Sequence, residues 1–236
     1  MRMDILTLFP GMFSGPFAES IVARAVASGL IDLQIHDLRR WTHDRHHTVD
    51  DMPFGGGPGM ILKPEPIFEA VAELGTPDAE ILLLTPNGEL LRQEIVADLS
   101  TREHLILICG HYEGIDERVA DHLATRQISI GDYVLSGGEI PAMVIADAVI
   151  RLIPGALGCG DSTREEAHSD GLLEYPQYTR PASYGGFDVP EIVRSGNHQE
   201  LAKWKRNEAL ERTRERRPDL LRPGHLDELK RLERFG

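Results

Sequence analysis

Short apolar runs alternate with amphipathic segments along the first 150 residues of the chain. Apolar runs that end in Gly, Pro or polar turns predict buried strands, and apolar residues spaced three and four apart predict helices. The predicted strands cover residues 3–9, 33–36, 80–84, 105–109 and 127–130. The predicted helices cover residues 19–28, 64–74, 92–99, 117–123 and 140–153. This alternation predicts an α/β domain with a largely parallel sheet.

The pattern changes after the last of these helices. Pro154-Gly155 ends it, and residues 158–169 are rich in Gly, Ser and Glu without periodicity, which is typical of a linker. Beyond residue 189 the pattern is helical and polar, with a narrow apolar stripe that includes Leu201, Trp204 and Leu210. We therefore expect a main domain over residues 1–160, a linker over 161–172 and a small helical domain over 173–236.

Charge is distributed unevenly between these segments. The net charge of −13 argues against indiscriminate binding of nucleic acid. Residues 197–236, however, carry 11 basic and 8 acidic side chains, whereas the other 196 residues carry 14 basic and 30 acidic side chains. An anionic partner is therefore expected to dock partly through the C-terminal segment.

Cysteine content and hydropathy indicate the compartment. Cys109 and Cys159 are the only cysteines, so a disulfide framework is not expected. No apolar run approaches the roughly 18 residues of a membrane span. The first residues enter a strand pattern at once and lack the features of a signal peptide. These features predict a cytoplasmic protein that does not bind membranes.

A long polar loop over about residues 42–58 contains side chains that can bind metals. His43, His46, His47, Asp50 and Asp51 are suitable by type, but their spacing matches no helical zinc motif. A mobile polar loop that closes over a polyanion is therefore the favoured interpretation, and a metal site is the alternative. The glycines that follow are neither a Walker A loop nor a dinucleotide fingerprint.

Glycine-bearing turns follow three of the predicted strands. They cover residues 84–88, 109–118 and 130–139. Glycine lets backbone N–H and C=O groups approach a ligand closely, and α/β proteins bind ligands at the carboxyl ends of their strands. The turns therefore predict a small-molecule pocket that is built from backbone and has apolar walls from Ile130, Tyr133 and Leu135. The alternative is that they are tight turns only.

Four segments together resemble the bacterial tRNA (guanine-N1)-methyltransferases of the SPOUT superfamily. They are residues 43–60, 109–118, 129–143 and 171–181, in the family's order. The resemblance implies transfer of a methyl group from S-adenosylmethionine to N1 of the guanine just 3′ of the tRNA anticodon. It also implies a deep trefoil knot, a homodimer with its active site at the subunit interface, and a need for a divalent cation, expected to be Mg²⁺.

The resemblance also implies roles for individual residues. Arg151 corresponds to the arginine that stabilises guanine O6, and Glu166 stands where the family has the aspartate that acts as base. Because the linker departs from the family pattern, Asp161 and Asp170 remain alternative bases. No dedicated metal cage is expected, although Glu113 is a possible metal ligand. The implied donor-binding residues are Leu84, Pro86, Gly110, Glu113, Ile130, Gly131, Asp132, Tyr133, Val134, Leu135, Gly137, Gly138 and Pro141.

Contacts with tRNA are expected from three places. The loop 43–47 and Arg39-Arg40 lie near the target base in the family. The third place is the basic segment 203–217, where seven basic side chains outnumber three acidic ones. Three other classes of protein are the alternatives: a non-catalytic RNA-binding protein, a hydrolase whose metal is held by residues 43–51, and a Rossmann-type methyltransferase.

Overall fold

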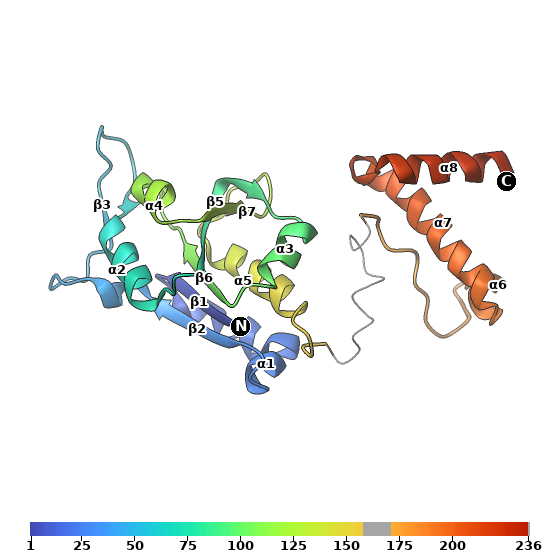
Figure 1. Ribbon diagram of the computed structural model, residues 1–236, viewed down its shortest axis with the longest axis horizontal. Coiled ribbons are helices and arrows are strands. Elements are labelled where there is room, and N and C mark those ends of the chain that lie inside the picture. Colours follow the sequence, from blue (N-terminus) through green and yellow to red (C-terminus); the bar gives the residue numbers. More distant parts are fainter. Residues whose placement is uncertain (158–170, 236) are drawn as a thin grey trace. The chain divides into compact units, whose positions relative to one another are not determined.

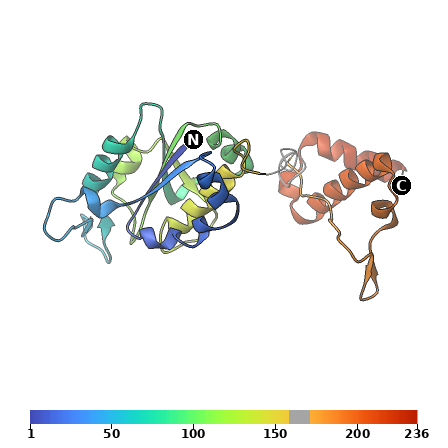
Figure 2. The same ribbon diagram turned by 90° about the horizontal axis from the view of Figure 1, so that it is seen from below.

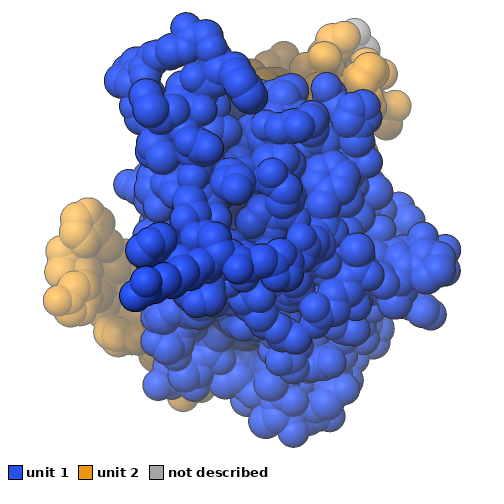
Figure 3. Space-filling view, turned by 90° about the vertical axis from the view of Figure 1, so that its left-hand side faces the viewer, with its two compact units in different colours: residues 1–160 blue, residues 161–236 orange. Residues whose placement is uncertain are grey.

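The computed structural model describes residues 1–157 and 171–235 of the chain. The chain divides into two compact units, residues 1–160 and 161–236, which Figure 3 draws in blue and orange. Most of the predicted linker, including Glu166, Asp161 and Asp170, lies outside the described residues. No helix of the described residues is long and apolar enough to cross a bilayer.

A five-stranded sheet with the order β2-β1-β6-β5-β7 forms the centre of unit 1. All four strand pairings are parallel, so the predicted α/β domain with a parallel sheet is confirmed. Every residue of β6 is buried, as expected of a central strand covered on both faces. The strands are β1 (Arg2–Thr7), β2 (Asp32–Asp37), β5 (Glu80–Leu90), β6 (His104–Cys109) and β7 (Arg126–Ser129).

Helices cover both faces of this sheet (Figure 1). One buried cluster joins Met3 and Ile5 to α1, α3 and α5, and another joins Leu6 and Ile108 to α2 and α4. Alternate residues of β1 thus serve opposite cores, as strand geometry requires. The helices are α1 (Ser20–Ala27), α2 (Pro64–Leu74), α3 (Gln93–Leu99), α4 (Glu117–His122) and α5 (Glu139–Ile150).

The strand predicted to end at Leu84 continues to Leu90, so the prediction of a terminating turn at 85–88 was wrong. Leu84 and Glu89 both pair with Ile128, and the residues between them form a bulge in β5. A Cβ atom at Gly88 would lie 2.4 Å from the backbone nitrogen of Ile128. Gly88 therefore permits close approach of two backbones rather than the end of a strand.

Unit 2 is mainly helical, in line with the pattern of the sequence. Its core consists of Leu172, Ala209, Leu210 and Leu229. The backbone N–H of Leu173 donates a hydrogen bond of 2.9 Å to the hydroxyl of Thr213, which ties the incoming chain to the long helix. The helices are α6 (Glu191–Arg194), α7 (His198–Arg216) and α8 (Pro223–Phe235).

Several short elements were not predicted. Figure 2 shows a two-stranded hairpin that extends away from the helices of unit 2. It is formed by β8 (Ser183–Tyr184) and β9 (Phe187–Asp188). In unit 1, β3 (Asp50–Asp51) and β4 (Ile61–Leu62) pair at the two ends of the glycine-rich half of the polar loop. The 3-10 helices are η1 (Pro10–Phe13), η2 (Pro16–Ala18), η3 (Leu38–Trp41) and η4 (Pro218–Leu220).

Candidate active site

A pocket of about 530 Å³ lies where the loops after β6 and β7 meet the bulge of β5. Parallel strands bring their carboxyl ends to one edge of a sheet, so these segments converge there. The volume falls within the range of small-molecule sites, roughly 300–1,000 Å³. Twelve predicted donor-binding residues line it: Leu84, Pro86, Gly110, Glu113, Ile130, Gly131, Tyr133, Val134, Leu135, Gly137, Gly138 and Pro141. Asp132, which is exposed, is not among the lining residues.

The two glycine loops contact each other directly through their backbones. The N–H of Gly138 donates a hydrogen bond of 2.7 Å to the carbonyl oxygen of Gly110. A Cβ atom at Gly138 would lie 2.6 Å from the Cα atom of Cys109, so only glycine fits at this crossing. Segments nearly 30 positions apart therefore form one continuous wall of the pocket.

The end of the polar loop is hydrogen-bonded to the part of the pocket lining that contains Glu113 and Gly114. The N–H of Glu113 donates to the carbonyl oxygen of Met60 at 3.1 Å, and the N–H of Leu62 donates to the carbonyl oxygen of Gly114 at 3.0 Å. Gly59 has a φ of +84°, and a Cβ atom there would lie 2.2 Å from Cγ of Glu113. The sequence did not predict this contact, although the run of glycines before Met60 was a signal of close approach.

The first half of the polar loop is organised by one carboxylate. Asp44 accepts hydrogen bonds from the hydroxyl and backbone N–H of Thr48, each at 2.8 Å, and from the N–H of His46 at 3.0 Å. The bonds from Thr48 are the main reason that the pKa of Asp44 falls to about 2. No group of three His, Cys, Asp or Glu side chains in residues 1–157 and 171–235 converges as in a metal site. The alternative of a metal site in this loop therefore has no support from the described residues.

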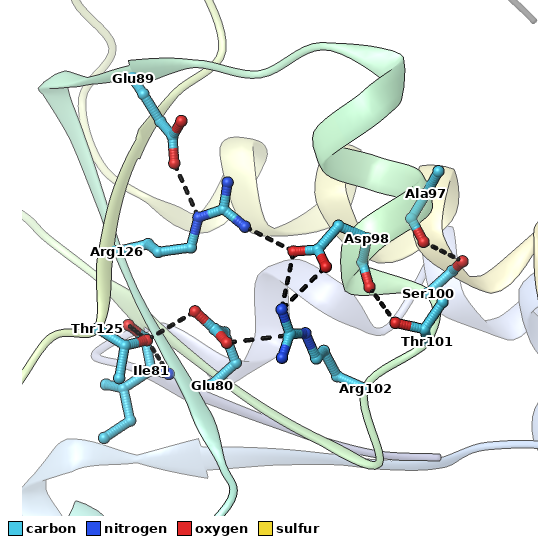
Figure 4. A network of polar contacts seen from close by, with 10 residues as sticks. All are labelled: Glu80, Ile81, Glu89, Ala97, Asp98, Ser100, Thr101, Arg102, Thr125 and Arg126. Atoms are coloured by element: carbon cyan, nitrogen blue, oxygen red, sulfur yellow. Dashed lines mark hydrogen bonds and ion pairs between the residues drawn. The ribbon is translucent and has the colours of Figure 1, made fainter.

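A network of charged side chains braces the bulge of β5 from outside the pocket (Figure 4). Arg126 of β7 contacts Glu89 at 2.8 Å and Asp98 of α3 at 2.9 Å. Arg102 also contacts Asp98, at 2.9 Å, and lies 3.8 Å from Glu80 at the start of β5. Acidic and basic groups alternate, so each charge has a neighbour of opposite sign. This network ties both ends of β5 to α3.

Arg151 lies far from the pocket of its own chain. It caps the C-terminal end of α5, whereas the first residue of that helix, Glu139, adjoins the pocket wall. Twelve residues at 1.5 Å each separate the two ends by about 18 Å. Arg151 is not among the lining residues. The described residues therefore do not bring the predicted catalytic arginine to this pocket.

Helix α5 is apolar on nearly all sides, and part of its apolar surface is exposed. Ile140 and Val144 are 49% and 40% exposed on one face. Helix η1 packs against α5, and Met12 of η1 and the preceding Phe9 are also exposed apolar residues. A helix that is apolar all round is normally buried, so this surface has the character of an interaction site.

Many basic side chains of α7 already have acidic partners within unit 2. Arg206 pairs with Glu228, and Arg214 pairs with Glu233, each at 2.8 Å. Lys205 lies over the ring of Tyr175 at 4.5 Å. Ion pairs of Arg212 and Arg216 are absent from the described part of the chain. These two arginines are therefore the most available cations of the basic segment.

Fold and pocket together define the class of the protein. It is an α/β protein with a parallel sheet covered on both faces and a small-molecule pocket built from backbone loops at the carboxyl edge. The family model of tRNA (guanine-1)-methyltransferase TrmD matches residues 1–223. The chain belongs to this family.

Similar proteins include three that carry the name tRNA (guanine-N(1)-)-methyltransferase. The chain is 57% identical over 221 residues to that of Dictyoglomus turgidum, covering 94% of this chain and 90% of the relative. It is 56% identical over 223 residues to the protein of Geobacillus kaustophilus, and the match covers 94% of this chain and 91% of that relative. It is 55% identical over 224 residues to the protein of Dehalococcoides mccartyi, and the match covers 94% of this chain and 90% of that relative. The similarity thus spans both units.

Proposed function

We propose that the protein transfers a methyl group from S-adenosylmethionine to N1 of the guanine 3′-adjacent to the anticodon of tRNA. The observation that carries this proposal is the backbone-built pocket at the carboxyl edge of the sheet, in a chain of the TrmD family. The donor supplies an electrophilic methyl group on a positively charged sulfur. The protein must then hold the donor and activate the acceptor.

The pocket suits a nucleoside-containing donor. Glycines at 110, 137 and 138 keep side chains out of this wall, so we propose that backbone groups of the two turns hydrogen-bond the edge of an adenine. The N–H and carbonyl of Gly138 are bonded to Gly110 and Ala142, so the contacts fall to the other residues of the turns. Ile130 and Leu135 provide apolar walls for the faces of the base. The contact between the 110 and 138 turns is consistent with a trefoil knot, which we propose for this unit.

Activation of the acceptor requires two groups. Guanine N1 carries a proton and is not nucleophilic at neutral pH, so a base must accept that proton. We assign this role to Glu166, with Asp161 and Asp170 as the alternatives. Negative charge then develops on O6, and the guanidinium of Arg151 is suited to donate hydrogen bonds to it.

The distance of Arg151 from its own pocket favours a homodimer. An arginine side chain cannot span the roughly 15 Å of helix between Arg151 and Pro141, a lining residue of α5. The exposed apolar residues of α5 and η1 provide a surface on which a second copy could pack. We propose that two copies associate there and that Arg151 acts in the pocket of the partner subunit.

The tRNA is proposed to contact both units. Arg212 and Arg216 of α7 are the cations best placed to contact phosphates, because their charges are not engaged within the described residues. Arg39-Arg40 and residues 43–47 are proposed to contact the RNA near the target base. Mg²⁺ is expected to assist while keeping most of its water ligands, since no dedicated cage is assigned. The cytoplasm is the expected site of action.

Single-turnover transfer of labelled methyl from S-adenosylmethionine to tRNA tests these roles. Arg151→Ala and Glu166→Gln should each slow transfer by about 100-fold or more, while donor affinity stays within about twofold. Unchanged transfer in Glu166→Gln would exclude it as the base, and the same measurement on Asp161→Asn and Asp170→Asn would then identify the base.

A further inference from the structure

Glu139 is a buried carboxylate that has no role in the chemistry proposed above. Only 1% of the residue is exposed, and no Lys, Arg or His in the described part of the chain forms an ion pair with it. The hydroxyl of Thr7 donates a hydrogen bond of 2.8 Å to its Oε1 atom. Burial of an ionised carboxylate without a cation is unfavourable, and the bond from Thr7 together with the position of Glu139 in the first turn of α5 offsets this cost.

Glu139 lies directly behind one wall of the donor pocket. A Cβ atom at Gly137 would lie 2.3 Å from Oε2 of Glu139 and 2.6 Å from Cδ2 of His111. Gly137 and His111 both line the pocket, whereas Glu139 does not. The carboxylate therefore adjoins the Gly137 part of the pocket wall from behind.

Thr7 connects this carboxylate to the sheet. It is the last residue of β1 and lies 132 positions before Glu139. Its hydroxyl oxygen also accepts a hydrogen bond of 2.9 Å from the backbone N–H of Phe9, so the hydroxyl proton points away from Phe9 and is free to donate to Glu139. The rigid end of β1 thus holds the start of α5 and the glycine turn before it.

We propose that Glu139 is a positioning residue, held by Thr7, that sets the Gly137 wall of the pocket for binding of S-adenosylmethionine. The proposal rests on the donor site proposed above. Without the hydroxyl of Thr7, a buried carboxylate oxygen loses its donor and must move toward another one. Because Oε2 abuts Gly137, this movement displaces the wall.

Calorimetric titration of the purified full-length protein with S-adenosylmethionine tests the proposal. Thr7→Val keeps the shape of the side chain but removes the hydroxyl, and it should raise the Kd by about tenfold. Thr7→Ser restores the donor and should bind within about twofold of wild type. At saturating donor, kcat of Thr7→Val should stay within about threefold of wild type, because the proposed catalytic groups lie elsewhere.

A matched control comes from the other end of the sheet. Thr76→Val removes a hydroxyl that lies 3.2 Å from His104 at the start of β6, and it should leave the donor Kd unchanged. If Thr7→Val does not fold, Thr7→Cys replaces the hydroxyl with a weak thiol donor of similar size. Its Kd should exceed that of Thr7→Ser by about threefold.

The two proposals fail in different ways. Absence of donor binding to the wild-type protein would contradict the donor site itself. If the wild-type protein binds S-adenosylmethionine and Thr7→Val binds it with equal affinity, only the proposed role of Glu139 is overturned. If Thr7→Val does not fold, equal affinity of Thr7→Cys and the wild-type protein has the same meaning. Equal weakening in Thr7→Ser and Thr7→Val would also overturn it, because the hydroxyl would then not be the relevant group.

Discussion

Glu113 of the pocket is hydrogen-bonded to Met60 at the end of the polar loop, with 3.1 Å between the donor nitrogen and the acceptor oxygen. Glu113 lines the pocket, and Met60 follows four glycines with positive φ. The polar loop is proposed to contact the tRNA, whereas the pocket is proposed to bind S-adenosylmethionine. The bond therefore joins the two substrate sites through main-chain atoms.

Gly59 is the position where this junction is most sensitive to substitution. Gly59→Ala should weaken donor binding by about tenfold or more, because its Cβ atom would lie 2.2 Å from Cγ of Glu113 and displace that side chain. Calorimetric titration with S-adenosylmethionine measures the effect.

Gly56→Ala is the matched control for this prediction. Gly56 has nearly the same φ, +80° against +84°, but no atom lies within 4 Å of its Cβ position. Both variants carry the same backbone strain, roughly 1 kcal/mol, so only the contact with Glu113 differs. Equal donor affinity in the two variants would show that this contact is unimportant.

The position of Arg151 predicts that activity is shared between subunits. Arg151→Ala and Gly110→Leu should each be inactive alone, the second because its side chain fills the pocket while its Cβ makes only ordinary contacts, at 3.5 Å or more. A heterodimer of the two should recover about half of wild-type methyl transfer, because one site then has an intact pocket and an intact arginine. Activity no higher than that of the two parents would place Arg151 in the pocket of its own chain.

The buried position of Asp4 predicts that the free energy of unfolding depends on pH. It is fully buried, and its carboxylate lies 2.6 Å from Nε2 of His36 and 2.7 Å from Nε2 of His104. Burial raises its pKa, but hydrogen bonds from His36, Arg2 and His104 outweigh this effect and lower the pKa from 3.8 to about 2. Because the folded state holds the proton more weakly, the stabilisation is complete above about pH 4 and is lost as pH falls toward 2.

Urea denaturation between pH 2 and 7 measures this contribution. Asp4→Asn should reduce the free energy of unfolding by about 2 kcal/mol at pH 7, and the difference from wild type should shrink as pH approaches 2. Asp32→Asn, at an exposed position of β2, should show no such trend. A constant difference for Asp4→Asn across the range would contradict the lowered pKa.

The sequence predicted the parallel α/β architecture because local patterns determine it. Helix α2 agrees with its predicted bounds, since Pro64 fits the first turn and Gly75 follows the last. Two errors have physical causes. At Asn87-Gly88 the turn signal was overridden by close approach of β7, and the hairpin at Gly185-Gly186 was missed although a pair of glycines between aromatic residues is a hairpin signal.

The candidate site was predictable only in part. The glycine turns indicated a pocket, and the family resemblance supplied its individual residues. The contact between Thr7 and Glu139 spans 132 positions, and no spacing rule relates such residues. The contact of Gly59 with Glu113 likewise depends on how two loops meet in space. These features follow from the fold rather than from any local pattern.

The most direct test of the central claim is the identity of the methylated nucleoside. The protein should be incubated with S-adenosylmethionine and a tRNA transcript that has guanine 3′ of the anticodon, and the digested product analysed by mass spectrometry. We predict a single N1-methylguanosine at that position, and none in a transcript with adenine there. Methylation of another nucleoside, or equal methylation of both transcripts, would contradict the proposed function.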